Sequence, residues 1–307
     1  MQNFLKKSQR DTETLFKTYL AAEVERRFSP IERIDPISED EFAQRYVKPG
    51  IPVIIKNMTD QWPAMKKWNF DFFQSEYGDV DIKINLYDSS TPAKEIKLHQ
   101  ALDKIVKGNE LTYLQEWWFG ADYPDLEKDF TTPPYFASCA AKELFRYDSH
   151  LLFVGSQGSS TYAHQDTIHT NVWSAQISGE KRWILFGRKA HLPILPDGSA
   201  DTETFFQDPA SQITHCRLLP GEILFIPYQW WHRVDLIQDS ISLHGLYTTQ
   251  DLLPAYVKDM FAIPLATALN RDLLLEKNKM RFDINMMSCQ VFAKLMGFNV
   301  NNVLGVN

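Results

Sequence analysis

Two fragments that lie 68 residues apart hold side chains able to bind a metal ion. His164 and Asp166 stand two residues apart in the first fragment, and His232 ends the second, Trp230-Trp231-His232. Two imidazoles and one carboxylate that folding brings to one point form the facial triad of a non-heme Fe(II) oxygenase, which leaves coordination positions open for a cosubstrate and O₂. The residue types therefore predict metal-dependent oxidation.

The His-x-acid element is weak evidence by itself. With 8 histidines and 39 acidic residues in a chain of 307, about one such element is expected by chance. The context is stronger, because strand-forming residues surround both fragments in short runs, at 171–177, 181–186, 223–226, 230–234 and 240–247. Turn residues separate these runs, and Ser178-Gly179-Glu180 predicts a hairpin between the first two.

Short strands at this spacing predict a mainly β protein: a double-stranded β-helix, the jelly-roll or cupin barrel, with flanking α-helices. Such a barrel gathers side chains from distant strands into one cavity. We expect a helical segment at 1–30, a catalytic domain at 31–250 and a second helical segment at 251–307. Ser38-x-x-Glu41 has the form of a capping box and would begin a helix inside the catalytic domain.

Lys181 shares a strand face with Trp183 and Leu185, because side chains at i and i+2 point to the same side of a strand. A lysine in an aromatic-lined interior is costly unless an anion meets it, and the carboxylate of a bound cosubstrate would be that anion. The lysine also follows the turn at Gly179 closely, so its ammonium could reach water instead. Strand parity leaves both orientations open.

The motifs follow one another in a characteristic order, which runs Thr161-x-x-His164-x-Asp166, Trp173, Gly179-Glu180-Lys181-Arg182-Trp183-x-Leu185-Phe186, Pro220-Gly221-Glu222, Ile226-Pro227 and Trp230-Trp231-His232. This order resembles the JmjC (cupin-8) family of Fe(II)/2-oxoglutarate oxygenases. The 17-residue step from His164 to Lys181 is similar to the branch that holds the nuclear JmjC lysyl hydroxylase. The resemblance covers about residues 31–250.

The resemblance implies that His164, Asp166 and His232 bind Fe(II). It also implies that Lys181 and Thr161 hold the distal carboxylate of 2-oxoglutarate. With O₂, the cosubstrate would yield succinate, CO₂ and an oxidant that removes hydrogen from a substrate C–H bond, and no separate general base is needed.

Three further positions bear on the cosubstrate. Tyr113 resembles a tyrosine that helps to hold the same carboxylate in some members of the family. The chain departs from the closest branch at Ser174, where that branch has an asparagine, and at His244, where it has a threonine. His244 could donate to a carboxylate, or it could be a core histidine satisfied by a neighbouring backbone group.

The remaining histidines have no acidic or cysteine partner at ligand spacing, and we expect core or solvent roles for His99, His150, His169, His191 and His215. The aromatic cluster Trp117-Trp118-Phe119 is expected in the core more than in a substrate groove.

Composition bears on partners and compartment. A net charge of -7 and short basic runs disfavour nucleic acid, so a protein or peptide side chain is the expected substrate. Three cysteines, an odd number without metal spacing, argue against a disulfide framework and favour a cytoplasmic setting. No membrane span is expected, because residues 1–14 carry charges without a long apolar run.

Several alternatives remain open at this stage. The C-terminal helices would mediate a homodimer, or they would pack on their own barrel. The same chemistry also serves N-methyl-lysine or N-methyl-arginine demethylation and tRNA-base hydroxylation. A cupin that uses Mn or Zn without O₂, or a non-catalytic binding protein, would retain the barrel.

Overall fold

The computed structural model describes most of the chain: residues 21–86, 94–108, 111–120, 122–145, 150–166, 168–188, 190 and 212–260. Of the helical segment expected at 1–30, residues 21–30 are described, and 21–27 of these are helical. The expectations for His191, for Cys289 and for the chain after residue 260 lie outside the described residues.

Nine strands form the larger of two sheets, in the order β1-β2-β11-β8-β13-β6-β5-β3-β4. Their bounds are β1 Arg33–Ile34, β2 Val53–Ile55, β3 Asp81–Leu86, β4 Lys94–Lys97, β5 Thr112–Trp117, β6 His150–Gly155, β8 Asn171–Ser178, β11 Ile223–Ile226 and β13 Ser240–Tyr247. Only the short β1–β2 pair is parallel among these pairings; the others are antiparallel.

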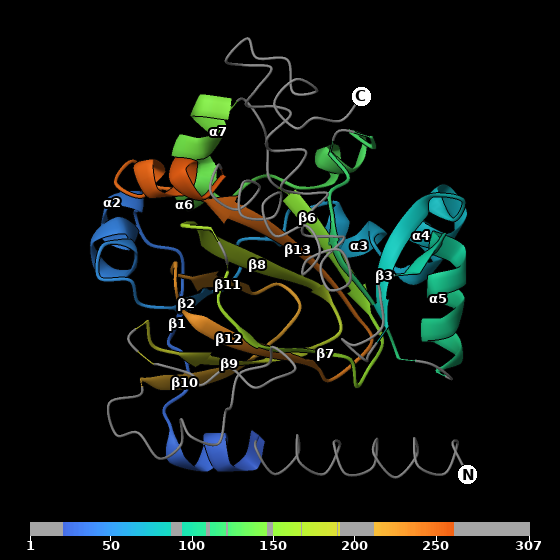
Figure 1. The fold of residues 1–307 in the computed structure, drawn as a ribbon, viewed down its shortest axis with the longest axis horizontal. Coiled ribbons are helices and arrows are strands. Elements are labelled where there is room, and N and C mark those ends of the chain that lie inside the picture. The colour runs from blue at the N-terminus through green and yellow to red at the C-terminus, as the bar shows by residue number, and fades with distance from the viewer. Residues whose placement is uncertain are drawn as a thin grey trace, which may run out of the picture.

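Four antiparallel strands form the smaller sheet, in the order β10-β9-β12-β7. Their bounds are β7 Ser160–His164, β9 Lys181–Phe186, β10 Ile213–Leu218 and β12 Trp231–Leu236. Figure 1 shows this sheet as a second layer facing β6, β8, β11 and β13. The predicted mainly β jelly-roll barrel is confirmed.

The hairpin predicted at Ser178-Gly179-Glu180 is wrong. β8 pairs with β11 and β13 in the large sheet, whereas β9 pairs with β10 and β12 in the small sheet. The turn is real, because Gly179 has a φ of 70° and a Cβ there would lie 2.0 Å from the carbonyl oxygen of Asp239. It carries the chain from one sheet to the other. A turn signal marks a reversal but does not decide which strand becomes the neighbour.

Apolar side chains fill the space between the sheets. Trp183, Leu185 and Val234 of the small sheet meet Leu224 and Ile226 of the large sheet in one buried cluster. Alternate residues of the large sheet, such as Phe225 and Trp173, face a second and larger aromatic cluster on the opposite side. Both faces of the large sheet are therefore buried, which explains the nearly continuous apolar runs of its central strands.

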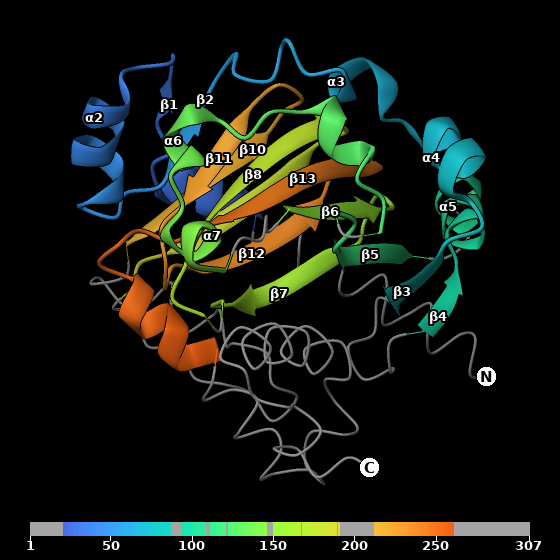
Figure 2. The ribbon, with the colours of Figure 1, turned by 90° about the horizontal axis from the view of Figure 1, so that it is seen from above.

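Helices cover that second face. Their bounds are α2 Glu39–Phe42, η1 Ala43–Val47, α3 Ala64–Lys67, α4 Phe70–Tyr77, α5 Leu98–Lys107, η2 Leu126–Asp129, α6 Pro134–Ala137 and α7 Ala140–Phe145. Figure 2 shows α4 and α5 at one end of the large sheet and α2 with α6 at the other. Phe119 is fully buried and Trp117 packs against the same cluster, as expected for core residues. Residues 253–260 form a further helix.

The helix expected near Ser38 is confirmed. Ser38 caps α2 and its side chain accepts a hydrogen bond of 3.2 Å from the backbone N–H of Glu41. The carboxylate of Glu41 pairs with Arg45 at 2.8 Å. In the described parts of the chain, no helix combines the length and the apolar character needed to cross a bilayer.

Candidate metal centre

The three predicted metal ligands meet at one point. Antiparallel pairing of β7 with β12 places His164 directly opposite His232, and their ring centroids lie 4.2 Å apart. Asp166 follows β7, and its Oδ1 lies 3.9 Å from Nε2 of each histidine. The three ligand atoms lie within 4.8 Å of one another, so one metal ion is within reach of all of them.

Hydrogen bonds orient both imidazoles. Nδ1 of His164 lies 2.8 Å from the carbonyl oxygen of Tyr162, and Nδ1 of His232 lies 3.1 Å from the carbonyl oxygen of Trp230. A carbonyl oxygen only accepts, so each Nδ1 carries the hydrogen and donates it. Each Nε2 then presents its lone pair toward Asp166. An imidazole with its hydrogen on Nδ1 is the tautomer that binds a metal through Nε2.

The donor set fits a first-row divalent metal such as Fe(II). Two imidazole nitrogens and one carboxylate suit Fe(II) in a facial arrangement, with no cysteine to favour a closed zinc site. The side chains of His164 and Asp166 are 31% and 33% exposed, so one side of the centre remains accessible from outside. This is the one group of three or more such ligands found among the described residues.

Lys181 points into the barrel, which answers the question that strand parity left open. Its side chain is fully buried, and Nζ donates to Ser242 Oγ at 2.5 Å and to Tyr113 Oη at 3.2 Å. The ammonium also lies 5.3 Å from the ring centroid of Phe153. Burial lowers the pKa of Lys181 to about 7. Within the described residues, no carboxylate forms an ion pair with this buried cation.

Two of the other predicted cosubstrate residues are connected to Lys181, Tyr113 directly and Thr161 through Tyr113. Tyr113 is buried, and burial raises the pKa of its hydroxyl, an effect that a hydrogen bond with Thr161 partly offsets. Gln115 Nε2 donates to Thr161 Oγ1 at 3.1 Å. Lys181, Tyr113 and Thr161 therefore form one polar group that reaches from β9 across β5 to β7.

Ser174 and His244 contact each other. His244 Nε2 lies 2.9 Å from Ser174 Oγ and 3.1 Å from Ser242 Oγ, and its ring stacks on Phe153 with 4.0 Å between centroids. Burial lowers the pKa of His244 well below its ordinary value, and the nearby charge of Lys181 adds to this, so the imidazole is neutral. Of the two roles left open for His244, the backbone partner is not found at Nε2, where serine hydroxyls take its place.

Sequence reasoning missed Ser242, although it contacts both Lys181 and His244. A signal was present: Ser242 stands two residues before His244 in a β-patterned run, and residues at i and i+2 share a strand face. The face of β13 that carries His244 therefore carries a second polar side chain into the same interior.

The other described histidines make isolated contacts outside the centre. His99 Nδ1 lies 2.9 Å from the carbonyl oxygen of Gly78, and His215 Nε2 lies 3.2 Å from that of Phe28. None of these histidines joins a group of metal ligands within the described ranges.

Three of these histidines do have acidic partners, which spacing did not reveal, and the longest of these contacts joins His99 Nδ1 to Asp79 Oδ1 at 3.8 Å. His150 lies 2.9 Å from a carboxylate oxygen of Glu127, and His169 lies 2.5 Å from one of Asp259. His169 and Asp259 are 90 residues apart in the chain, so only the folded barrel brings them together.

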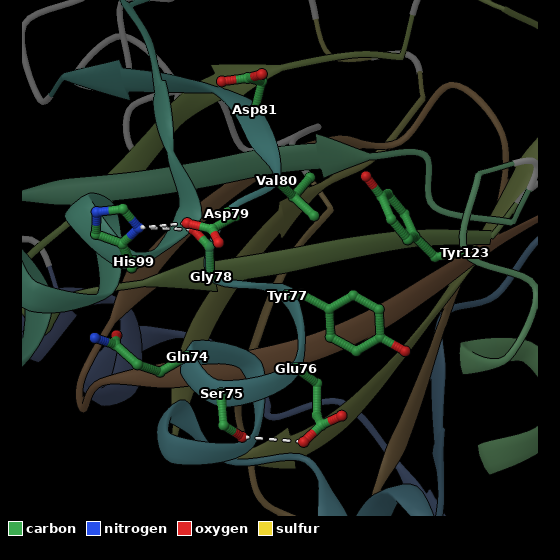
Figure 3. A pocket seen from close by; sticks show the side chains of 10 residues that line it. All are labelled: Gln74, Ser75, Glu76, Tyr77, Gly78, Asp79, Val80, Asp81, His99 and Tyr123. Atoms are coloured by element: carbon green, nitrogen blue, oxygen red, sulfur yellow. Dashed lines mark hydrogen bonds and ion pairs between the residues drawn. The ribbon is translucent and has the colours of Figure 1, made fainter.

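A surface hollow of about 520 Å³ lies away from the metal centre. Figure 3 shows its lining around α4 and the start of α5, with His99 turned toward Gly78 and Asp79. None of the three ligand residues lines it. The hollow is therefore separate from the candidate metal chemistry.

Comparison with known proteins agrees with this geometry. The model of the Cupin_8 family, a cupin-like domain, matches residues 38–251. The chain is 28% identical to arginine-specific demethylase JMJ22 of Arabidopsis thaliana, over 78% of this chain and 51% of that protein.

Two further relatives carry other activity names. The 2-oxoglutarate and iron-dependent oxygenase JMJD4 of Gallus gallus is 26% identical, over 70% of this chain and 59% of that protein. The bifunctional arginine demethylase and lysyl-hydroxylase psr-1 of Caenorhabditis elegans is 27% identical, over 73% and 62%. The chain thus spans about half to three fifths of the length of these three relatives. The family match, over most of the chain and on the fold described above, shows that the chain belongs to the JmjC-type Cupin_8 family of cupin-like domains.

Proposed function

We propose that this protein is an Fe(II)- and 2-oxoglutarate-dependent oxygenase that hydroxylates a side chain of a protein or peptide. The observation that carries the proposal is a fully buried lysine inside the same barrel as an open three-ligand metal centre. In the register of β9 with β12, His232 lies opposite Leu185 and Leu236 lies opposite Lys181, so both functional side chains project from one face of the small sheet.

The buried end of the barrel interior, which holds Lys181, favours an anionic ligand. Removing an ammonium from water is costly unless an opposite charge or several hydrogen bonds compensate. Lys181 has two hydroxyl partners and two aromatic rings near its Nζ, and none of these carries a negative charge at neutral pH. A dicarboxylate that chelates a metal at one end and meets Lys181 at the other satisfies both parts of the site.

The residues divide the work. His164, Asp166 and His232 would hold Fe(II), which when bound supplies the activation of O₂ coupled to decarboxylation of the 2-oxo acid to succinate and CO₂. Lys181 would bind the distal carboxylate by a charge-assisted hydrogen bond, with help from Tyr113. Nearby apolar rings keep water from this contact.

Thr161, Ser174 and His244 would complete the cosubstrate site. The Thr161 hydroxyl lies on the strand that ends at His164, where it can bond to the same distal carboxylate as Lys181. A neutral His244, held by Ser174, can donate a hydrogen bond without adding a second positive charge beside Lys181. These assignments are the part of the proposal most specific to this chain.

A protein side chain is the favoured substrate. The relatives named above include an arginine-specific demethylase and a bifunctional arginine demethylase and lysyl-hydroxylase. Both names describe action on amino-acid residues of proteins. The net charge of -7 also disfavours a polyanionic nucleic acid. N-methyl demethylation is the second candidate, because hydroxylation of an N-methyl carbon releases formaldehyde through the same chemistry.

Mass spectrometry tests the proposal directly. Lysate proteins would be incubated with the purified protein, Fe(II) and 2-oxoglutarate in air, with Asp166→Ala protein as the matched control. We expect gain of one oxygen on defined protein residues and formation of succinate, both absent in the control. Formaldehyde with loss of methyl groups would favour demethylation, and oxidised tRNA nucleosides would favour the base hydroxylase. An anaerobic reaction with Mn or Zn would contradict the oxygenase.

We also propose a homodimer formed through residues 251–307. The described start of this segment, the helix at 253–260, packs on its own domain, where Leu253 and Tyr256 contact the cluster around Cys139. The dimer would therefore depend on the residues that follow. Sedimentation at tens of micromolar distinguishes the two states: a dimer is expected, and a monomer would contradict the proposal.

A cytoplasmic setting completes the proposal. Both described cysteines, Cys139 and Cys216, are buried free thiols, which suits a reducing compartment where ferrous iron also persists. Localisation of a fluorescent fusion by microscopy tests this point, and accumulation in an oxidising compartment would contradict it.

A further inference from the structure

The loop that carries Asp166 is held by a helix outside the family match. His169 stands three residues after Asp166, and both its backbone N–H and its Nδ1 donate to the same oxygen, Oδ2 of Asp259, at 2.9 and 2.5 Å. Asp259 belongs to the helix at 253–260, beyond the matched residues 38–251. Its side chain is only 18% exposed, so these charge-assisted bonds are shielded from competing water.

An apolar contact supports the same attachment. Ile168, next to His169, packs against the buried cluster of Cys139, Ala141 and Tyr256, and Leu253 and Met260 of the helix pack against the same cluster. The loop and the helix therefore pack on one hydrophobic cluster and are joined by a pair of hydrogen bonds. Together these hold Ile168 and His169, which follow Asp166 closely in the chain.

A second set of hydrogen bonds fixes the loop on the other side of Asp166. Gln165 Nε2 donates to the backbone oxygen of Gln229 at 2.7 Å, and Gln229 Nε2 lies 3.4 Å from His169 Nε2. Because Nδ1 of His169 donates its hydrogen to Asp259, Nε2 is the nitrogen that accepts from Gln229. Gln165, Gln229, His169 and Asp259 thus form one chain of hydrogen bonds that brackets Asp166.

The same chain of hydrogen bonds includes the turn that precedes the third metal ligand. Gln229 stands three residues before His232, and its φ of 61° lies in the left-handed region that residues other than glycine seldom adopt. A residue in this conformation persists when its surroundings hold it there. The contacts of Gln229 with Gln165 and His169 supply such support.

We propose that Asp259 is a positioning residue of the metal centre. Acting through His169 and Gln229, it holds the loop that carries Asp166 and the turn that leads into His232. It touches neither the metal nor the substrate. This inference rests on the proposed function, because it gives Asp259 a role at that same centre. Without the carboxylate of Asp259, the side chain of Asp166 would occupy more positions, and metal binding would have to restrict them.

Manganese binding tests the inference, because Mn(II) takes the same donors as Fe(II) and is stable in air. The affinity of the full-length protein for Mn(II) would be measured by the EPR signal of the free ion, well below the melting temperature of every variant. Asp259→Ala should bind Mn(II) about tenfold more weakly than wild type, in the range seen when residues that orient metal ligands are lost. Asp251→Asn, a change at an exposed aspartate before the helix, is the matched control and should bind as wild type.

A double-mutant cycle with His169→Ala separates positioning from general stability. If Asp259 acts through His169, the double variant should lose less Mn(II) affinity than the sum of the losses in the two single variants. Should Asp259→Ala fail to fold, Asp259→Asn keeps a neutral acceptor and should show an intermediate loss. Wild-type Mn(II) affinity in the folded Asp259 variants, whatever their melting temperatures, would overturn the inference and leave the proposed function standing. Additive losses would refute the route through His169, and a wild-type protein that binds no metal would overturn both.

Discussion

The two ends of the barrel interior are built for opposite charges. At one end His164, Asp166 and His232 offer two lone pairs and a carboxylate to a cation, and two of these side chains are about a third exposed. At the other end Lys181 is fully buried and offers a positive charge to an anion. The same cupin barrel therefore combines an accessible group of three side chains of metal-binding types with a fully buried lysine.

On the proposed function, the difference in burial would set how each end selects its ligand. An accessible centre lets a metal and a substrate side chain arrive from solvent, and the geometry of the ligands supplies the selection. At the buried end the low local dielectric strengthens the attraction between Lys181 and a carboxylate, but it also penalises the lysine when that carboxylate is missing. Cosubstrate binding should thus depend on charge at one end and on metal at the other.

Loss of the metal ligands should have the largest effect. His164→Ala, Asp166→Ala and His232→Ala should each abolish succinate formation and Mn(II) binding, because three ligands are the minimum of this centre. Circular dichroism should show an intact fold in each variant. His99→Ala, at a histidine outside the centre, is the control and should remain active. Wild-type turnover in any of the three would show that the metal assignment is wrong.

Loss of Lys181 should affect the opposite end alone. Lys181→Ala should weaken 2-oxoglutarate binding about tenfold to hundredfold, as expected for a charge-assisted bond of roughly 1.5 to 3 kcal/mol. Mn(II) affinity without cosubstrate should stay within about twofold of wild type, a range of roughly 0.4 kcal/mol. Anaerobic titration measures both values. Equal 2-oxoglutarate affinity in the variant and the wild type would break the comparison at its anionic end.

The pH dependence of binding should identify the buried lysine. Its pKa of about 7 in the ligand-free protein means that it is charged below this pH and neutral above it. A bound carboxylate favours the charged form and raises the pKa, so the complex must take up a proton above pH 7. Affinity for 2-oxoglutarate should therefore be constant in mildly acidic buffer and fall by up to about tenfold per unit above neutrality. Lys181→Met should bind 2-oxoglutarate weakly, and its affinity should not show this fall above neutrality.

Thr161→Val should have the smallest effect, since it removes a neutral hydroxyl and nearly preserves volume. A neutral hydrogen bond contributes about 0.5 to 1.5 kcal/mol, so a loss of roughly twofold to tenfold in 2-oxoglutarate affinity is expected. The measurement is the same anaerobic titration. A loss as large as that of Lys181→Ala would mean that charge does not dominate this end.

The types of the key residues were readable from the chain, but their surroundings were not. The spacing of His164, Asp166 and His232 predicted one centre, and the structure places them together. The side of the strand on which Lys181 ends could not be decided, because burial depends on which strands pack over it. Tyr113 on β5 and Ser242 on β13 close that end, and neither lies near Lys181 in sequence.

Strand neighbours were the weakest part of the sequence reasoning. The residues of β8 and β9 have strand propensity and a glycine turn between them, which is also what a hairpin shows. Pairing is decided by competition among all strands of the barrel, and here the consecutive strands β7, β8 and β9 belong in turn to the small, the large and the small sheet. A local signal contains no information about that competition.

By itself the sequence determined the chemistry that this protein can perform, because imidazole, carboxylate and ammonium groups are properties of residues and their order matched a barrel. Only the tertiary structure decided where each group acts. It oriented Nε2 of His164 and His232 toward Asp166, closed the interior over Lys181, and brought Asp259 to His169 across 90 residues. These outcomes depend on long-range packing and on backbone carbonyls, whose positions are set by the whole fold and by no short stretch of the chain.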